Sequence, residues 1–223
     1  MCFNRDRELS MDEPCVHVVD DDASFLTAVS RLLRGSGFTV HTHASAADFL
    51  ARHHDDSPGC VVADLRMPGV DGFALQAALG RTSDPLPMLF LTGQGDIASS
   101  VRAMRGGAED FLEKTAPRDE LVGAVRRALA RDEREREARR HVEALRARFA
   151  TFTSREHQVL SHVVRGRLNK QIAGDLGIGE RTVKVHRRSI MTKLGVRSVA
   201  ALTRMTQEAG MPVVEEAGFP KMQ

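Results

Sequence analysis

The sequence predicts two folded modules: a five-stranded, doubly wound parallel α/β sheet over residues 14–130, and an all-α, four-helix domain over residues 151–208. In the front module, short apolar runs alternate with segments of helical periodicity, a pattern typical of repeated βα units. The rear module has helical periodicity throughout, with two short helices joined by a glycine turn. Residues 14–120 carry nine Lys/Arg and fifteen Asp/Glu, a net charge of −6, whereas residues 151–208 carry eleven and four, a net charge of +7. This asymmetry indicates two kinds of partner, with polyanion binding expected of the rear module.

The elements of the front module follow from hydrophobic periodicity and from turn residues. Each apolar run is short enough for a strand that is buried on both faces of a parallel sheet. Gly35 and Gly106 end two of the helices, and Pro117 opens the last helix near its first turn. These signals predict strands at 15–20, 38–43, 60–64, 88–92 and 110–113, and helices at 23–34, 44–53, 71–79, 97–105 and from Pro117 onward.

The segments that flank the modules are polar. Residues 131–150 begin with RDEREREARRH, and alternating charges of this kind predict a solvated, charged helical linker. A coiled coil is the alternative, but apolar residues are not sustained at heptad spacing. Residues 1–13 are expected to be a disordered extension and residues 209–223 a tail.

Composition indicates a cytoplasmic protein with no membrane partner. No apolar run is long enough to span a bilayer, and the N-terminus lacks the apolar core of a signal peptide. The three cysteines, Cys2, Cys15 and Cys60, form no metal or disulfide pattern. Cys15 and Cys60 lie in strand-like runs, where reduced, structural thiols are expected.

Chemically active side chains follow the apolar runs of the front module. Asp20 and Asp21 end the first strand, Asp64 ends the third, Thr92 ends the fourth, and Lys114 follows the fifth. Because parallel sheets gather ligand chemistry at the carboxyl ends of their strands, these side chains should converge in one crevice. Three neighbouring carboxylates repel one another unless a cation joins them, and hard oxygen ligands suit Mg²⁺ completed by water and phosphate. With a hydroxyl and an ammonium facing the same phosphate, the set suits phosphoryl transfer onto an aspartate.

Four motifs, VVDDD, DLRMPGVDG, LTGQGD and DFLEK, occur in an order and spacing that resemble the receiver domain of two-component response regulators. The LTGQGD stretch is most similar to the FixJ-like branch. The resemblance implies a flavodoxin-like fold in which Asp64 is the phosphoacceptor. It further implies that Asp21 and Asp64 bind Mg²⁺ directly, that Asp20 acts mainly through a bound water, and that Arg66 contributes its backbone carbonyl.

The same resemblance implies how the phosphoryl group is read. Thr92 and Phe111 match a switch pair, in which the hydroxyl moves toward the phosphate and the aromatic ring turns inward, and Lys114 contacts the phosphoryl oxygens. From its position alone Phe111 is also expected to be a core aromatic, and the two roles are compatible. One position departs from the family pattern: receivers usually place a proline after the lysine, and Thr115 stands there instead. A trans or a strained peptide bond is expected, because a cis bond before a non-proline residue costs about 3 kcal/mol.

The rear module reads as a helix-turn-helix domain. Helices are expected at 154–165, 169–176 and 180–194 and from about Ser198, with a glycine turn after the second. At 100° per residue, the third helix turns one apolar face inward. The opposite face mixes cations, one small apolar side chain and a hydroxyl, which suits contacts to bases and phosphates in a major groove. The inward residues are Val183, Ile190 and Leu194, and the outward residues are Arg181, Lys184, Val185, Arg188 and Thr192.

The TSRE, NKQIA, TVKVHR and KLGVRS stretches are similar to the four-helix DNA-binding domain of the LuxR family. By that resemblance one group of side chains probes bases, namely Lys184, Val185 and Arg188. A second group holds the phosphate backbone, namely Asn169, Lys170, Thr182, His186 and Arg187. His186 has an equal alternative as a half-buried packing residue. Gly179 and Glu180 replace the more usual serine-containing start of the third helix, which predicts weaker capping, although Gly179 can still serve as the cap.

Together the two resemblances imply a phosphorylation-dependent transcriptional regulator. A sensor histidine kinase would phosphorylate Asp64, the receivers would form a homodimer through the fourth helix and fifth strand, and the rear modules would bind double-stranded promoter DNA, with RNA polymerase as a further partner. Two alternatives stay open. A haloacid-dehalogenase-like phosphatase also uses an aspartate nucleophile, a hydroxyl, a lysine and Mg²⁺, but it needs an acidic motif after the lysine and leaves the basic module unexplained, so no enzyme is expected. A regulator that binds DNA without phosphorylation would use the crevice only structurally.

Overall fold

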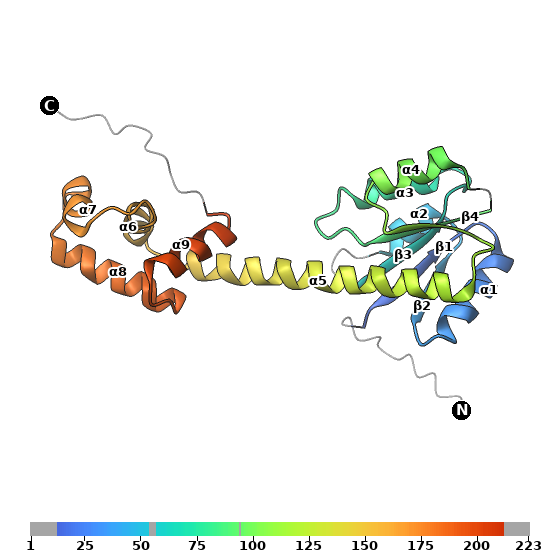
Figure 1. Ribbon diagram of the computed structural model, residues 1–223, viewed down its shortest axis with the longest axis horizontal. Helices are drawn as coiled ribbons and strands as arrows, with labels where there is room; N and C mark the ends of the chain where they lie inside the picture. The colour runs from blue at the N-terminus through green and yellow to red at the C-terminus, as the bar shows by residue number, and fades with distance from the viewer. Residues whose placement is uncertain (1–12, 54–56, 94, 212–223) are drawn as a thin grey trace. The chain divides into compact units, whose positions relative to one another are not determined.

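The computed structural model describes residues 13–53, 57–93 and 95–211, and the chain divides into two compact units between Arg136 and Glu137. Figure 1 shows the α/β unit, which contains β1 to β5, and the helical unit, which contains α6 to α9. The expected disordered extension and tail lie almost entirely outside the described residues. No helix in the described part of the chain is long and apolar enough to cross a bilayer.

Five parallel strands form one sheet in the order β2-β1-β3-β4-β5, which confirms the doubly wound, flavodoxin-like prediction. Every residue of β1, β3 and β4 is buried, which is why these strands are mainly apolar in sequence, with His17 as the polar residue inside β1. The edge strands β2 and β5 are only partly buried. The strands are β1 (Cys15–Val19), β2 (Thr39–His43), β3 (Gly59–Asp64), β4 (Met88–Thr92) and β5 (Asp110–Glu113).

Helices cover both faces of this sheet. One apolar core lies under α1 (Ala23–Arg34) and the start of α5 (Arg118–Ala150). The other lies under α2 (Ala46–Arg52), α3 (Gly72–Leu79) and α4 (Ile97–Arg105). Side-chain caps fix where these helices begin: Asp22 accepts backbone N–H bonds at the start of α1, and Ser45, Asp71 and Asp96 do so for α2, α3 and α4.

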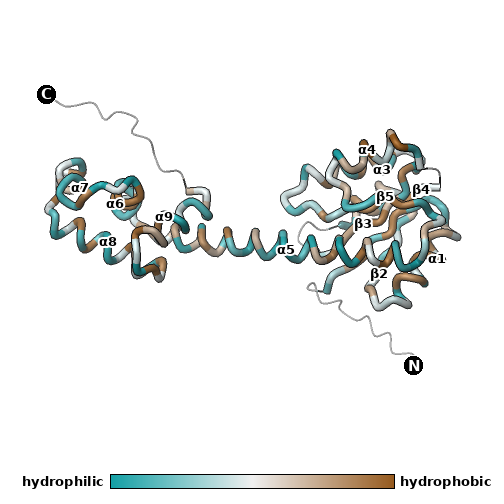
Figure 2. The backbone as a smooth tube through the Cα atoms, in the orientation of Figure 1, coloured by the Kyte–Doolittle hydropathy of each residue, from teal (hydrophilic) through white to brown (hydrophobic). Residues whose placement is uncertain are grey.

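The helix α5 runs through the boundary between the units, and its charged stretch is less solvated than the sequence predicts. Figure 2 shows the mainly hydrophilic character of this stretch. Asp132 is only 2% exposed and accepts a hydrogen bond from the backbone N–H of Gly59 at 2.9 Å. Arg136 pairs with Asp132 at 3.0 Å and with Asp84 at 2.7 Å. The helical linker is found, but its first two turns are not solvated as expected, because ion pairs to the buried Asp84 and Asp132 hold them to the α/β unit.

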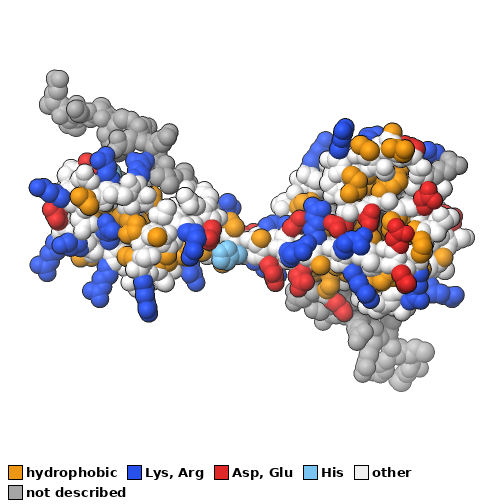
Figure 3. All heavy atoms as spheres, viewed as in Figure 1, with side chains coloured by type: hydrophobic (Ala, Val, Ile, Leu, Met, Phe, Trp, Pro, Cys, Tyr) orange, Lys and Arg blue, Asp and Glu red, His pale blue; other side chains and the backbone are white. Residues whose placement is uncertain are grey.

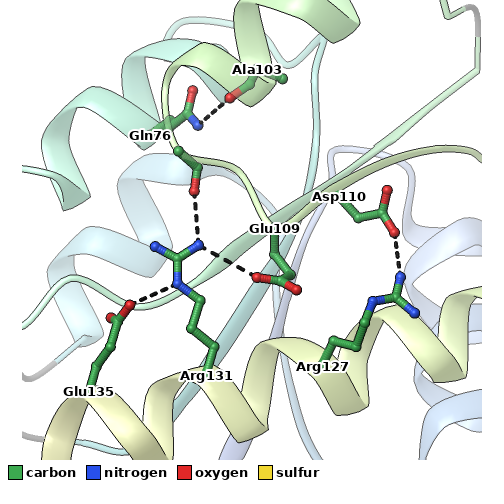
Figure 4. Close-up of polar contacts among 8 residues, drawn as sticks. Gln76, Ala103, Glu109, Asp110, Arg127, Arg131 and Glu135 are labelled. Atoms are coloured by element: carbon green, nitrogen blue, oxygen red, sulfur yellow. Dashed lines mark hydrogen bonds and ion pairs between the residues drawn. The ribbon is translucent and has the colours of Figure 1, made fainter. Parts of the chain in front are cut away.

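Two further ion pairs join α5 to the edge of the sheet. Arg127 donates to Asp110 Oδ2 at 2.6 Å, and Arg131 bridges Glu135 at 2.8 Å and Glu109 at 3.5 Å (Figure 4). The two arginines lie on the side of the helix that faces β5, where they meet the carboxylates of Asp110 and Glu109.

The helical unit is built from α6 (Ser154–Val164), α7 (Asn169–Leu176), α8 (Glu180–Leu194) and α9 (Val199–Glu208), close to the predicted bounds. Val183, Ile190 and Leu194 of α8 are buried, as predicted. Leu145 and Phe149 from the end of α5 complete the same core. Gly177, with φ of 62°, closes α7 in the left-handed conformation that glycine adopts without strain.

Candidate functional site

The structure brings Asp20, Asp64 and Lys114 into contact at the carboxyl edge of the sheet. Lys114 Nζ lies 2.6 Å from Asp20 Oδ2 and 3.0 Å from Asp64 Oδ2. Asp20 is 1% exposed and Asp64 is 8% exposed, whereas the neighbouring Asp21 is open to solvent. One ammonium therefore bridges two buried carboxylates that lie far apart in the sequence.

Local backbone bonds hold these side chains in place. Asp20 Oδ1 accepts the backbone N–H of Asp22 at 2.9 Å, which orients the carboxylate at the turn into α1. Asp64 Oδ1 accepts the backbone N–H of Arg66 at 3.3 Å. The backbone N–H of Lys114 donates to the Thr92 carbonyl at 2.8 Å, so the end of β5 is tied to the end of β4.

The site holds three carboxylates and one ammonium, so negative charge is in excess. Burial raises the pKa of Asp20, and the Lys114 ammonium opposes this rise without cancelling it. Burial alone would lower the pKa of Lys114, but hydrogen bonds and charge from Asp20 and Asp64 outweigh burial and raise it. Lys114 is thus held as an ammonium, and its single charge leaves the three carboxylates in excess.

The residues fit a hard divalent cation. One carboxylate oxygen from each of Asp20, Asp21 and Asp64 lies within 4.8 Å of the other two. Oxygen ligands of this kind, with one carboxylate open to solvent, suit Mg²⁺, which keeps several of its waters. A divalent charge would also balance the excess negative charge beside Lys114.

Thr92 and Phe111 lie on neighbouring strands beside this crevice. Thr92 is 1% exposed at the end of β4. The Phe111 ring is half-buried, packs against the core beneath α4, and has its centroid 6.2 Å from that of Phe90. Phe111 thus has the core contacts expected of it, while a switching role for the pair stays a prediction.

The threonine that follows the lysine leaves the backbone unstrained. No peptide bond in the described segments is cis, and none of their non-glycine residues has positive φ. Of the two expectations for Thr115, the trans bond is the one found. Lys114 nevertheless reaches both carboxylates, so a proline at position 115 is not needed to place its side chain.

The helix α8 presents a basic surface on the helical unit. Val185 is 61% exposed, an unusual position for an aliphatic side chain. The exposed residues of the set predicted to bind DNA are Lys170, Arg181, Thr182, Lys184, Val185 and Arg188, and the half-buried ones are Asn169, His186 and Arg187. Figure 3 shows the Lys and Arg side chains that project from this unit.

Not all of these side chains are free to reach a ligand. Arg187 Nη1 donates to Asn169 Oδ1 at 3.0 Å, so this pair joins α8 to α7. A groove beside the pair is lined by Asn169, Lys184, Arg187, Arg188 and Arg197, among others. Arg197 lines this groove as well, although it was not among the residues predicted to contact DNA. At Gly179 no side chain caps α8, as the weaker-capping prediction requires.

Glu156 is the buried residue that sequence reasoning passed over. Its carboxylate accepts hydrogen bonds from Ser189 at 2.7 Å and Lys193 at 2.7 Å, both on α8, and forms a capping box with Thr153. These bonds lower the pKa of Glu156 to about 2 against an opposing effect of burial. The glutamate of TSRE therefore ties α6 to α8, and the capping-box pattern in the sequence was the available signal.

Two family models match the chain. The receiver domain of response regulators matches residues 16–126, and the luxR family of bacterial regulatory proteins matches residues 150–206. The chain belongs to the two-component response regulators of the LuxR family. Its receiver and DNA-binding domains are those of a family of transcriptional regulators.

Relatives of this response regulator share both domains. Nodulation protein W of Bradyrhizobium diazoefficiens is 42% identical over 88% of this chain and 86% of its own length. The transcriptional regulatory protein FixJ of Azorhizobium caulinodans is 40% identical over 91% and 96%. Among solved structures, the response regulator StyR matches with a TM-score of 0.78 at 45% identity, over 88% of this chain and 99% of that one. Full-length FixJ from B. japonicum matches with a TM-score of 0.53 at 35% identity, over 90% and 99%.

Proposed function

We propose that Asp64 accepts a phosphoryl group from a phosphohistidine of a sensor kinase, and that the phosphorylated chain dimerises and binds promoter DNA. The observation that carries the proposal is the Lys114 ammonium, 2.6 Å from Asp20 and 3.0 Å from Asp64. A carboxylate nucleophile, a point positive charge and a cluster of oxygen ligands are the groups that phosphoryl transfer requires. Promoter DNA as the target places this activity in the cytoplasm.

In this reaction an oxygen of the Asp64 carboxylate attacks the phosphorus of the phosphohistidine. The new bond is O–P, the bond that breaks is N–P, and the imidazole leaves with the electron pair of that bond. Asp20, Asp21 and Asp64, with the backbone carbonyl of Arg66, would hold Mg²⁺, which neutralises phosphoryl oxygens when bound. Lys114 then exchanges its contact with the Asp64 carboxylate for one with the phosphoryl oxygens.

Thr92 and Phe111 would change conformation when Asp64 is phosphorylated. The Thr92 hydroxyl donates to a phosphoryl oxygen, and Phe111 turns into the space that this movement leaves. The adjoining helix α4 supports a partner surface, because Ile97, Val101 and Met104 are 84%, 42% and 49% exposed. Figure 3 shows hydrophobic side chains gathered on this side of the α/β unit. Pairing through α4 and β5 would remove these apolar side chains from water.

Dimerisation would couple phosphorylation to DNA binding through effective concentration. Two linked helical units bind a two-part site more tightly than one, without any new base contact. On α8, Lys184, Val185 and Arg188 would reach base edges. Lys170, Arg181, Thr182 and His186 would contact phosphates, and the Asn169–Arg187 pair would contact them at the mouth of its groove.

The test compares the wild type with Asp64→Asn, with and without a small-molecule phosphodonor and Mg²⁺. We expect phosphodonor to convert the wild type to a dimer and to raise its affinity for its genomic sites, and to leave the variant unchanged. A variant that still responds would show that Asp64 is not the acceptor. Equal DNA affinity of the wild type with and without phosphodonor would favour a regulator that needs no phosphorylation. Turnover of phosphomonoesters that is lost in Asp20→Asn but kept in Asp64→Asn would favour a phosphatase.

A further inference from the structure

Three potential metal ligands gather on the α2-facing side of β1 and β2, outside the phosphoryl site. Cys15 and His17 lie two residues apart on β1 and so share one face of the sheet, and His41 stands directly opposite His17 on β2. One ligand atom of each residue lies within 4.8 Å of the other two. Nothing in phosphoryl transfer or DNA binding uses these residues.

The residue types indicate which ion the cluster would take. A thiolate and two imidazoles are the ligands of borderline transition ions such as Zn²⁺, and they are poor ligands for Mg²⁺ or Ca²⁺. Tetrahedral zinc with ordinary bond lengths separates its ligand atoms by about 3.3–3.7 Å. His41 is exposed, so its side chain has room to rotate toward the other two ligands.

The contacts of His43 indicate which nitrogen of His17 carries the proton. His43 Nδ1 lies 3.5 Å from the Asp48 carboxylate without a hydrogen bond, and the attraction of this negative charge favours a proton on Nδ1, which leaves His43 Nε2 as an acceptor. His17 Nδ1 lies 3.2 Å from that acceptor and must therefore carry its own proton. His17 Nε2 is left with a lone pair, and it is buried without a hydrogen-bond partner among the described residues.

This arrangement is the one that a metal-bound histidine has. A ligating imidazole usually donates its second N–H to a group that fixes its tautomer and orientation, and here His43 backed by Asp48 is that group. His17 is 8% exposed, and its ring centroid lies 5.8 Å from that of His41 and 5.4 Å from that of His43. Ring packing against Phe49, at 5.2 Å between centroids, would be served equally by a phenylalanine at position 17, which has no nitrogen left unpaired.

We propose that Cys15, His17 and His41 form a binding site for a divalent transition ion of the zinc type. The fourth position is open to water, because His41 is exposed on the edge strand β2. The ligand is the thiolate, so ligation releases the Cys15 thiol proton to solvent as the sulfur–metal bond forms. The ion would join β1 to β2 and stabilise the edge of the sheet.

The experiment uses the full chain, without an affinity tag, in a Cys2→Ser background and with excess Mg²⁺ to fill the carboxylate crevice. Co²⁺ is the optical probe, because a bound thiolate gives a near-ultraviolet charge-transfer band. Zn²⁺ affinity is measured by competition with a chromophoric chelator. We expect one ion per chain, a thiolate band, and a rise in the melting temperature of the α/β unit on adding Zn²⁺.

Variants separate this site from incidental binding. Cys15→Ala should abolish the band, and His41→Ala, an exposed position, should weaken Zn²⁺ binding about tenfold or more. The matched controls are Cys60→Ala, whose thiol packs in the core beneath α1 and α5, and His141→Ala, an exposed histidine on α5. Both controls should bind as the wild type does. A band that survives in Cys15→Ala, equal affinity of His41→Ala and wild type, or no stoichiometric binding by the wild type would each overturn the proposal.

Discussion

Asp20 is a buried carboxylate that lowers the stability of the fold and at the same time supplies one oxygen of the carboxylate crevice. It is 1% exposed and lies beside Asp64, with the Lys114 ammonium shared between them. Because burial raises its folded-state pKa, the folded state holds a proton on Asp20 more tightly than the unfolded chain does. Stability is therefore lost as the pH rises above about 4, where the unfolded carboxyl ionises.

Asp20→Asn should consequently stabilise the α/β unit at pH 7 without Mg²⁺, by roughly 1 kcal/mol. The neutral amide removes one of three mutually repelling charges and leaves Lys114 paired with Asp64. Urea unfolding at pH 7 and at pH 4, in chelator, would measure the gain, which should shrink at the lower pH. Saturating Mg²⁺ provides the internal control, because it should stabilise the wild type and have little effect on the variant. A variant less stable than the wild type in chelator at pH 7 would contradict this account.

The contribution of Glu156 to folding stability changes with pH in the direction opposite to that of Asp20. Its folded-state pKa is lowered from 4.5 to about 2, so its contribution to stability is complete above about pH 4.5 and is lost as the pH falls toward 2. Glu156→Gln should destabilise the helical unit at pH 7 by about 1–3 kcal/mol, because Lys193 and Ser189 lose a charged acceptor. Hydrogen exchange of α8 amides would follow this unit by itself. Gln158→Ala on the same helix is the control, and a difference that persists unchanged at pH 2 would refute the assignment.

At the scale of elements, the middle of α5 carries charged side chains that are buried rather than exposed to solvent. Asp132 and Asp84 are 2% and 6% exposed, and Arg136 pairs with both and also donates to the Ser57 carbonyl at 2.6 Å. The alternating charges of this stretch are compatible with a solvated helix, and only the fold places two of them against the loop before β3. These contacts extend the helix of the α/β unit two turns past Ala130.

Arg136→Met should destabilise the α/β unit by about 3–5 kcal/mol, since it removes the positive charge that lies 2.7 Å from Asp84 and 3.0 Å from Asp132, both buried. Glu133→Gln, at an exposed position on the same turn, should change stability by less than about 0.5 kcal/mol. Chemical denaturation monitored by the amide signals of the sheet would distinguish the two variants. Equal stabilities would mean that the pairs around Arg136 add nothing to the fold.

At the scale of the whole molecule, the acidic and basic halves serve different partners. The proposed DNA contacts come from α7 and α8, so a dimer would offer each of them twice. Lys170→Ala should weaken binding similarly for all sequences and reduce the slope of log affinity against log salt by about 2 per dimer, one phosphate contact in each subunit. Lys184→Ala should instead change base preference. Arg204→Ala, on α9, removes the same charge elsewhere and should leave the slope unchanged. A slope reduced equally by all three variants would indicate a general charge effect.

Much of this protein could be read from its sequence because its signals are local. Four apolar runs and the FTVHTH stretch predicted the strands, and glycine and proline signals with helical periodicity predicted the helix ends to within one or two residues. The polar residues at the ends of four of the strands predicted which side chains share an edge. The parallel topology alone brings Asp20, Asp64 and Lys114 to one edge of the sheet, so their proximity followed from chain order.

Other features depend on contacts between distant residues, which only the tertiary structure decides. The sequence determined the two domains, their family and the residues of the carboxylate crevice. It could not show that Arg136 is buried against Asp84, that Glu156 joins α6 to α8, or that His17 and Cys15 lie beside His41. Each of these depends on strand register or helix packing, in which side-chain atoms of residues 24 to 52 positions apart come within 4.8 Å of one another. The periodicity of a sequence indicates whether a residue is buried or exposed, whereas the tertiary structure determines which residues it contacts.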